Sequence, residues 1–213
     1  MADVIIKVLE PADSFALLKL SELKTMLGIT DTTSDAQLQQ LIDWNSAYVS
    51  QIANRVFARE KVRETWRHLQ DRRVFLSHWP VLEEDIESVE SPRGTLLPGT
   101  DYELEEGSGK LSLFGARTEP IVVTYTGGFD LPDEAPNDLK SAAAILVRKG
   151  RTEAQQEATA GIRMISHKDS RVMFFDPNTA SRSGGGSGSS TGTSSEAIRT
   201  VHALLYHYSR LEV

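Results

Sequence analysis

The stretch from residue 122 to residue 147, VVTYTGGFDLPDEAPNDLKSAAAILV, constrains the fold more than any other part of the chain. Its β-branched and aromatic start is typical of a strand and leads into Gly127 and Gly128, where the backbone can turn at little steric cost. Pro132 and Pro136 prevent an early helix in the loop that follows, and Asn137 is an N-cap residue type. The helix predicted after it has an apolar stripe at helical spacing, formed by Leu139, Ala142, Ala143 and Leu146.

The region before this stretch predicts two helices and a set of short strands. A strand is expected at residues 4–9 and a short helix at 17–29. Ser34 and Gln37 form a capping-box pattern in front of a second helix at about 35–57. From about 61 to 126 the pattern changes to short β segments that we expect to pair as hairpins. The helix that starts at Asn137 is predicted to end near residue 150, followed by basic residues that suit its C-terminal end.

The C-terminal third has three different patterns. Residues 152–180 are compatible with either a hairpin, formed by 162–165 and 172–175, or an extended arm. The run SRSGGGSGSSTGTSS at 181–195 cannot supply a core and predicts a flexible tether. Residues 196–211 are amphipathic and predict a last helix.

Together these patterns predict an α+β protein: a mainly helical bundle of about four helices with an inserted small antiparallel β region and an extended C-terminal arm. We expect a core formed by residues 1–150, with the β insertion at about 61–126. An arm and tether at 151–195 and a C-terminal helix at 196–213 would complete the chain.

The composition excludes several classes of function. The chain has 213 residues, a net charge of −7 and no cysteine, which rules out disulfides, thiolate nucleophiles and cysteine-based zinc sites. The negative charge argues against a protein that grips nucleic-acid phosphates over its whole surface. It is compatible with a wall past which DNA slides. The longest apolar run near the start is Val4–Ile6, so we expect no membrane span and a protein that works in the cytoplasm or in a particle assembled there.

No group of residues has the spacing of an enzyme site. The five histidines form no HExxH or HxE motif, and Ser166, His167 and Asp169 lack the elbow sequence of a serine nucleophile. The glycine run at 184–186 lacks the strand, lysine and helix of a phosphate-binding loop. The acidic stretch 83–106 contains no calcium-loop motif and predicts a solvated or partner-facing edge. We therefore predict no catalytic, cofactor-binding or metal-binding residue.

Five short segments have a more specific likeness. They are the helix segment Leu20–Leu27, the helix end Tyr48–Phe57, the step His78–Val81, the junction Tyr125–Ala142 and the closing segment Leu204–Arg210. In this order they resemble the head–tail connector proteins (adaptor or head-completion proteins) of tailed bacteriophages. The junction is the most specific of the five. The long glycine-rich region 152–195 departs from the family pattern.

This resemblance implies a structural virion protein without enzymatic activity. Such proteins form a ring, here expected to be dodecameric, that joins the capsid portal to the tail or to the next connector and extends the DNA channel. The implied partners are the portal protein, a tail-side connector or tail-completion protein, and further copies of the chain. Genomic DNA would pass without sequence-specific binding, in a virion assembled in the host cytoplasm. Contacts with the portal or a neighbouring subunit are predicted for Arg182, Ile198, Arg199, Val201, Leu205 and Tyr208.

Three alternatives stay open at the level of the sequence. The apolar residues of the last helix can instead close the chain's own helical core. The chain can be another head–tail joining protein, such as a stopper or tail-completion protein. It can also be a small hydrolase or nucleotide-binding enzyme that acts through Ser166, His167 and Asp169 or through the glycine run.

Overall fold

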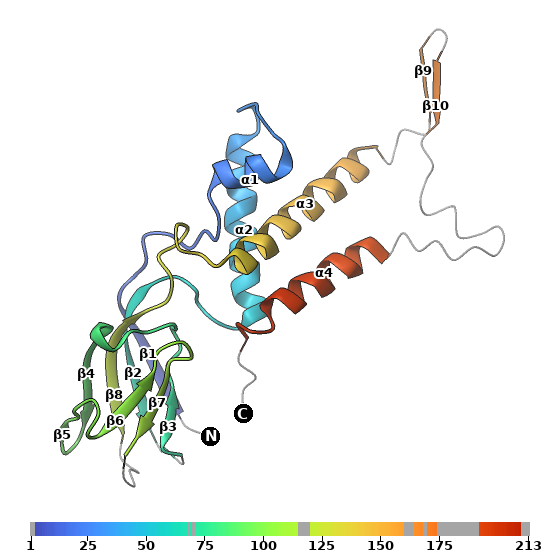
Figure 1. Cartoon of the computed structure of the whole chain (residues 1–213). Coiled ribbons are helices and arrows are strands. Elements are labelled where there is room, and N and C mark those ends of the chain that lie inside the picture. Colours follow the sequence, from blue (N-terminus) through green and yellow to red (C-terminus); the bar gives the residue numbers. More distant parts are fainter. Residues whose placement is uncertain are drawn as a thin grey trace.

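The computed structural model describes residues 3–67, 69, 71–114, 120–159, 164–167, 170–173 and 192–209, with side chains only outside 154–195. In chain order the elements are β1 (Asp3–Glu10), α1 (Leu20–Leu27), α2 (Asp35–Ala53), β2 (Glu60–Arg67), β3 (Arg73–Phe75), η1 (Glu83–Asp85), β4 (Ile86–Ser91), β5 (Gly94–Thr95), β6 (Tyr102–Glu105), β7 (Lys110–Leu113), β8 (Ile121–Gly127), α3 (Asn137–Thr159), β9 (Met164–His167), β10 (Ser170–Met173) and α4 (Gly192–Leu205). Strands β1 to β8 gather on one side of the helices (Figure 1).

Strands β1 to β8 form two antiparallel sheets that pack face to face. The larger has the order β1-β2-β8-β4-β5 and the smaller has the order β3-β7-β6. Central strand β8 supplies Ile121, Val123 and Tyr125, which alternate along it and are fully buried. We call the apolar cluster between the sheets the β core. It comprises Val62, Leu69, Val74, Leu76, Val81, Val89, Leu96, Tyr102, Leu111, Leu113, Ile121, Val123 and Tyr125.

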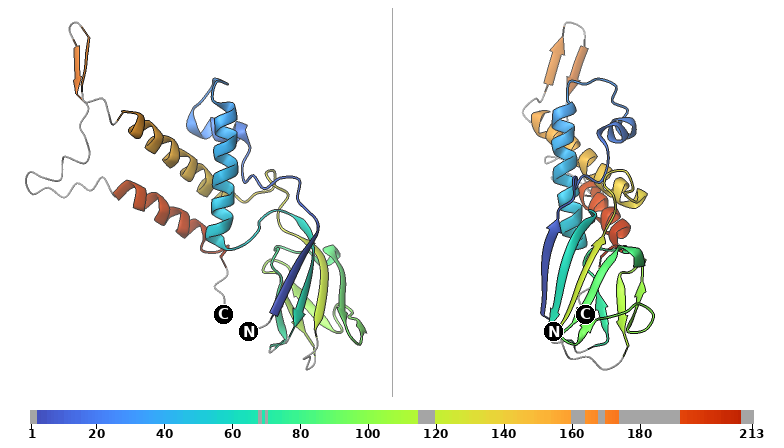
Figure 2. Two further views of the ribbon diagram at one scale, coloured as in Figure 1. Left: turned by 180° about the vertical axis from the view of Figure 1, so that it is seen from behind. Right: turned by 90° about the vertical axis from the view of Figure 1, so that its left-hand side faces the viewer.

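The four helices surround a second, separate cluster, which we call the helical core. Helices α3 and α4 lie side by side and both cross α2 (Figure 2). The loop before α1 also enters this core, where the amide of Leu17 donates to Ser46 Oγ at 3.0 Å. The members come from three distant stretches of chain: Leu17, Leu18, Leu23, Leu38, Ile42, Val49, Ala53 and Phe57; Leu139, Ala142, Ala143, Leu146 and Val147; and Val201 and Leu205.

Two residues with positive φ end the first two helices. Gly28, with φ 67°, follows α1, and its amide bonds back to the carbonyl of Thr25. Asn54, with φ 51°, follows α2, which therefore ends four residues earlier than the expected residue 57. The predicted capping box of α2 is wrong, because Ser34 precedes the helix without a side-chain cap hydrogen bond. Glu22 of α1 does accept the amide of Lys19, at 2.9 Å.

The α+β class is confirmed, but the prediction of a mainly helical bundle with a small β insertion is wrong. Strands are about as abundant as helices. The strand predicted at 4–9 joins the larger sheet through pairs such as Val4 with Trp66, and β4, which was missing from the prediction, pairs with β8. The β part is therefore a two-layer unit with its own core rather than an appendage of the bundle.

The C-terminal region differs from the prediction in its boundaries. Helix α3 continues to Thr159 instead of ending near residue 150, and α4 begins at Gly192, inside the expected tether. Between them β9 and β10 pair as an antiparallel hairpin, so the hairpin interpretation holds for 164–173. Across the part of the chain that the structure describes, none of the helices combines the length and the apolarity that a bilayer span needs.

Candidate functional site

Helix α4 carries four of the six residues that sequence analysis selected as partner contacts, Ile198, Arg199, Val201 and Leu205, and it uses two of them for packing. Val201 and Leu205 are 0% and 1% exposed and belong to the helical core. Tyr208, just after the helix, packs its ring edge-on against Phe57 at 6.1 Å between centroids. Burial beside Asp138 raises the pKa of the Tyr208 hydroxyl. These three residues hold α4 and the turn after it on the rest of the chain.

Two of the other predicted contacts are accessible. Arg199 is exposed and Ile198 is half-buried, so both can reach a second protein without disturbing the core. Arg182 lies outside the described residues. Among the described members of the predicted set, Val201, Leu205 and Tyr208 pack on the rest of the chain, and Ile198 and Arg199 are accessible.

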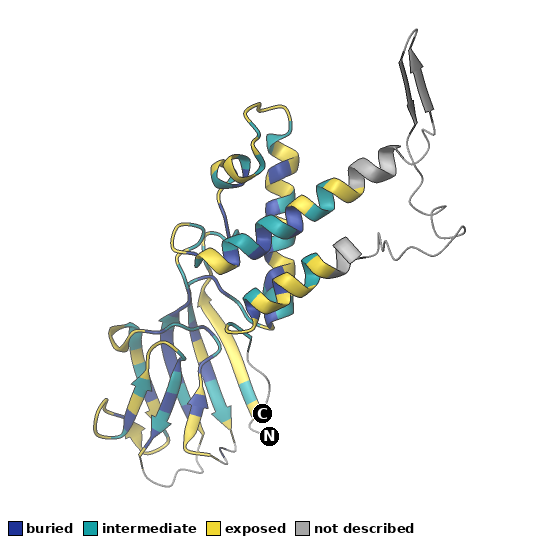
Figure 3. Ribbon diagram, turned by 45° about the vertical axis from the view of Figure 1, so that its right-hand side comes forward, coloured by how far each residue is buried: buried dark blue, intermediate teal, exposed yellow. Residues whose placement is uncertain are grey.

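Strand β1 is the most exposed apolar element of the β part (Figure 3). It is the first strand of the larger sheet, so β2 is its only neighbour in that sheet. Its aliphatic side chains Ile5, Ile6, Val8 and Leu9 are 37–47% exposed. Natural proteins commonly shield such edges, since an open row of backbone groups templates pairing with another chain.

Helix α2 carries another exposed surface, a stripe of side chains on the side opposite the residues that it contributes to the helical core. Trp44, which is 62% exposed, and Tyr48 lie one turn apart. The stripe is completed by uncharged side chains, Gln37, Gln40 and Gln51. Aromatic residues without neighbouring charge are typical of the centres of protein interfaces.

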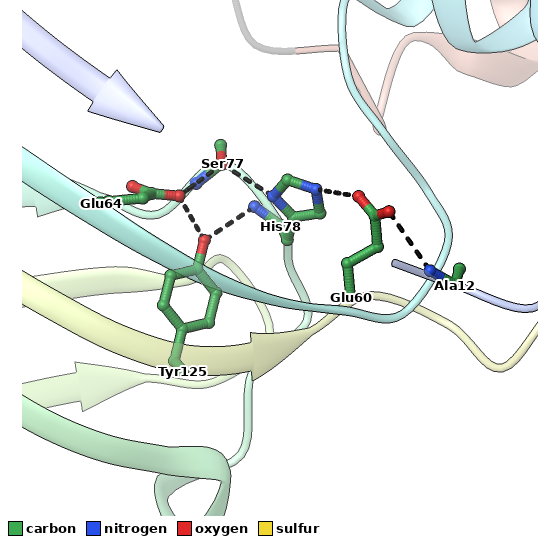
Figure 4. Close-up of polar contacts among 6 residues, drawn as sticks. All are labelled: Ala12, Glu60, Glu64, Ser77, His78 and Tyr125. Carbon is green, nitrogen blue, oxygen red and sulfur yellow. Dashed lines mark hydrogen bonds and ion pairs between the residues drawn. The ribbon is translucent and has the colours of Figure 1, made fainter. Parts of the chain in front are cut away.

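A buried polar network lies where the two parts of the chain meet (Figure 4). Tyr125 and Ser77 both donate hydroxyl hydrogen bonds to Glu64 Oε1, and the amide of His78 donates to Tyr125 Oη at 3.0 Å. The His78 ring lies 2.8 Å from Ser77 Oγ through Nδ1 and 3.0 Å from Glu60 Oε2 through Nε2. Burial, followed by the charge of Glu64, raises the pKa of Tyr125, so its hydroxyl remains a donor.

The side chains of Ser77, His78 and Glu60 contact one another in the order of a nucleophile, a base and an acid. Their hydrogen bonds nevertheless differ from those of a catalytic triad. The Ser77 hydroxyl donates to the Glu64 carboxylate as well as lying beside the His78 ring, so its single proton is not committed to the histidine as it is in a catalytic triad. We interpret the network as a structural one, because burying two carboxylates requires such partners.

The network also connects the two parts of the chain. The backbone amide of Ala12, in the segment that leads from β1 to α1, donates to Glu60 Oε1 at 3.3 Å. Close by, the guanidinium of Arg55 stacks on Trp79 at 3.6 Å and on Phe57 at 4.7 Å. These contacts fix the exit of α2 against the start of the β part.

The acidic stretch lies along η1 and β4, on the side of the larger sheet away from β1, and along β6 of the smaller sheet. It contains an open hollow of about 540 Å³, lined by Leu82, Glu83, Glu84, Pro98 and Glu106. Lys61 and Arg59 pair with Glu87 and Asp85 at 2.9 and 2.7 Å and hold the stretch against the sheet. Among the described residues no group of three or more histidine or acidic side chains could hold a metal ion.

The residues of the alternative enzyme hypothesis lie mostly outside the described part of the chain. Ser166 and His167 lie on β9, whose side chains are not described, while Asp169 and the glycine run at 184–186 lie outside the described residues. The buried network was not predicted. The available signal was the alternation of Glu60, Val62 and Glu64, which places all three on one face of a strand.

The comparisons with known proteins agree with this architecture. A model of the head completion protein family matches residues 16–164, well over half of the chain. The chain belongs to the head completion protein family. This membership confirms the resemblance found in the sequence and identifies a structural component of a virion.

Solved structures show the same fold at low sequence identity. A chain from the virion of a native gene transfer agent (GTA) particle has a TM-score of 0.55 at 14% identity. Chains from the neck of an empty GTA particle computed with C6 symmetry and from the neck of a native particle computed with C12 symmetry give 0.53 and 0.52, at 14% and 15% identity. Each match covers 98% of this chain and 97% of the other. No curated protein matches the chain.

Proposed function

We propose that this head completion protein forms a ring of twelve copies that joins the portal of a filled capsid to the tail or to the next connector. The likeness to neck chains over 98% of this chain carries the proposal, together with the six-fold and twelve-fold symmetries of those particles. A ring of twelve identical copies is compatible with both six-fold and twelve-fold symmetry. The ring would extend the DNA channel, and its net charge of −7 would keep the passing genome from adhering.

Helix α4 supports a contact with the portal or a neighbouring subunit. The proposed contact set is that of the sequence, Arg182, Ile198, Arg199, Val201, Leu205 and Tyr208. In the folded chain Val201 and Leu205 anchor the helix, while Arg199 and Ile198 are free to reach the partner. Many copies acting together would turn individually weak contacts into a stable joint. The ring would be assembled in the host cytoplasm and retained in the virion.

Native mass spectrometry of the purified protein, alone and mixed with portal from the same particle, tests the proposal. We expect either a free ring or monomers that form a twelve-copy collar on portal. The variant Arg199→Glu should weaken the collar while leaving the melting temperature unchanged, because the side chain is exposed. A monomer that ignores portal but binds a tail-side protein would replace the adaptor with a stopper or tail-completion protein. A monomer that binds neither would overturn the structural role.

A further inference from the structure

The outer face of the β1–β2 ribbon brings two positive charges together. Lys7 of β1 lies directly opposite Arg63 of β2 in the antiparallel register. Like charges in such a pair destabilise the sheet. Both side chains are exposed, and neither forms an ion pair with another residue that the structure describes. Arg63 donates to the hydroxyl of Thr124 at 3.2 Å, which leaves its charge uncompensated.

The same ribbon carries the apolar edge described above. The side chain of Ile5 shares the outer face with Lys7, and those of Ile6 and Val8 lie on the other face, while Leu9 lies at a register shift between Val8 and Glu10. We define the β1 edge as these four aliphatic residues together with Lys7 and Arg63. A surface that is apolar, cationic and open along its backbone fits a partner surface that is partly apolar and anionic.

The side of the β part opposite β1 has that composition. We define the acidic rim as Glu83, Glu84, Glu87, Glu90 and Glu106 with the exposed Leu82 and Leu97. Glu83 and Glu84 are exposed, and neither is paired with a cation among the described residues. The hollow that they line also has an apolar wall, formed by Leu82 and Pro98. This wall suits the aliphatic stem of a lysine or arginine whose charged group would lie among the carboxylates.

The positions of the two surfaces determine the kind of assembly that they can make. β1 and the β4–β5 end close opposite sides of one sheet, and the two views in Figure 2 both place them apart. A contact between unlike surfaces on opposite sides is heterologous, so each added copy exposes the same free surface again. Such a series closes into a ring when the rotation per copy allows it.

We propose that the β1 edge of one copy binds the acidic rim of the next copy. This assignment rests on the ring function proposed above and supplies one of its subunit interfaces. The like charges of Lys7 and Arg63 are then neutralised only in the assembled ring. The aliphatic side chains of β1 lose their exposure at the same time, with Leu82 and Leu97 of the neighbour as apolar partners.

Two charge-reversal variants test the interface. Lys7→Glu/Arg63→Glu reverses the β1 edge, and Glu83→Lys/Glu84→Lys reverses the rim. Each variant places like charges across every interface, so its assembly at physiological salt should fall at least about tenfold, alone or on portal. In a 1:1 mixture, each reversed edge meets a reversed rim and each native edge meets a native rim. The mixture should therefore restore rings that contain equal numbers of the two chains, measured by native mass spectrometry.

A control matched to Lys7→Glu/Arg63→Glu makes the same change in net charge at two exposed arginines outside both surfaces. Arg72→Glu/Arg148→Glu also lowers the net charge by four, and it should assemble like the wild type. Circular dichroism of all variants verifies that they fold. Wild-type assembly should also weaken as salt rises, because exposed charges are screened.

The outcomes separate this inference from the function on which it rests. If wild-type protein forms no ring either alone or on portal, the ring function itself fails. If wild-type rings form and both reversed variants assemble equally well, the interface lies elsewhere and this inference alone is overturned. Loss of duplex DNA binding by the Lys7→Glu/Arg63→Glu variant, with assembly intact, would assign the cations to DNA and would also overturn it.

Discussion

Replacing Leu205 with alanine tests whether α4 packs on its own chain. Leu205 is 1% exposed in the helical core, so the change removes buried carbon atoms worth about 0.8 kcal/mol per methylene and leaves a cavity. Leu-to-Ala substitutions in cores cost about 2–5 kcal/mol. Because α4 can partly collapse onto the gap, we expect a cost of about 2–3 kcal/mol. At about 2–4 °C per kcal/mol this lowers the Tm by roughly 4–12 °C.

Differential scanning calorimetry is the appropriate assay, because the chain has two separate hydrophobic cores. If they melt separately, Leu205→Ala should shift only the transition of the helical core, and Val89→Ala in the β core should shift the other. Tyr206→Ala is the matched control. Tyr206 adjoins Leu205 but is exposed, so its removal should change stability by less than about 0.5 kcal/mol.

An unchanged transition in Leu205→Ala would refute this reasoning. It would mean that α4 is not packed on the helical core in solution, and that Val201 and Leu205 are available to a partner. Portal binding by the same variant then distinguishes the two roles. A variant that melts early but binds portal once folded has lost only packing, whereas one that melts normally and no longer binds has lost a contact.

Three further predictions concern the junction and the surface. Tyr125→Phe should cost about 1–3 kcal/mol in chemical denaturation, because the buried carboxylate of Glu64 loses a donor. Gly127→Ala should prevent normal folding, since its new methyl would collide with the carbonyl oxygen of His78, and soluble yield and circular dichroism would record the loss. Burial raises the pKa of Glu22, but hydrogen bonds from Lys140 and a backbone amide outweigh it and lower the pKa overall. Glu22→Gln should therefore destabilise by about 0.5–1 kcal/mol at neutral pH, and its Tm difference from wild type should vanish as the pH falls below the folded pKa.

Each of these has an outcome that would contradict it. An equal denaturation midpoint for Tyr125→Phe would mean that the hydroxyl lies in water. Gly107→Ala, where nothing lies within 4 Å of the added atom, is the control for Gly127→Ala and should fold normally. The pKa of Glu22 in the folded chain lies below the ordinary 4.5, so its ionised carboxylate stabilises the fold at pH values above 4.5. This stability is lost as the pH falls through the folded pKa. A Tm difference that grows in acid would therefore reverse the sign of the argument.

Local pattern predicted the helices and most strands, but not how the strands associate. The segment at 4–9 was correctly predicted as extended, yet its partner β2 lies some sixty residues later, and periodicity contains no information on such a pair. β4 was missed because only Val89 of its six residues is fully buried, while its two glutamates made the segment resemble a solvated loop. A sheet edge with few buried residues gives little apolar signal.

The candidate site was predictable to a smaller extent. The amphipathic stripe of α4 correctly identified Val201 and Leu205 as side chains that need covering, but amphipathicity does not say whether the cover is internal. Glu60 and Glu64 were missed because ionised residues are rarely expected inside a protein. Their burial depends on Tyr125 and His78, which come from other segments and meet them only in the folded chain.

The helical core is built from three stretches of chain, the last of which contains Val201 and Leu205. Because a ribosome releases the chain from its N-terminus, this core is incomplete until α4 has been made. The β part has all its strands once β8 is out, so it can fold while synthesis continues. Helices α1 and α2 emerge early, before most of the strands, and their apolar faces stay uncovered until α3 and α4 follow. A ribosome stalled just after α3 would carry a finished sandwich beside an unfinished bundle, which only α4 completes.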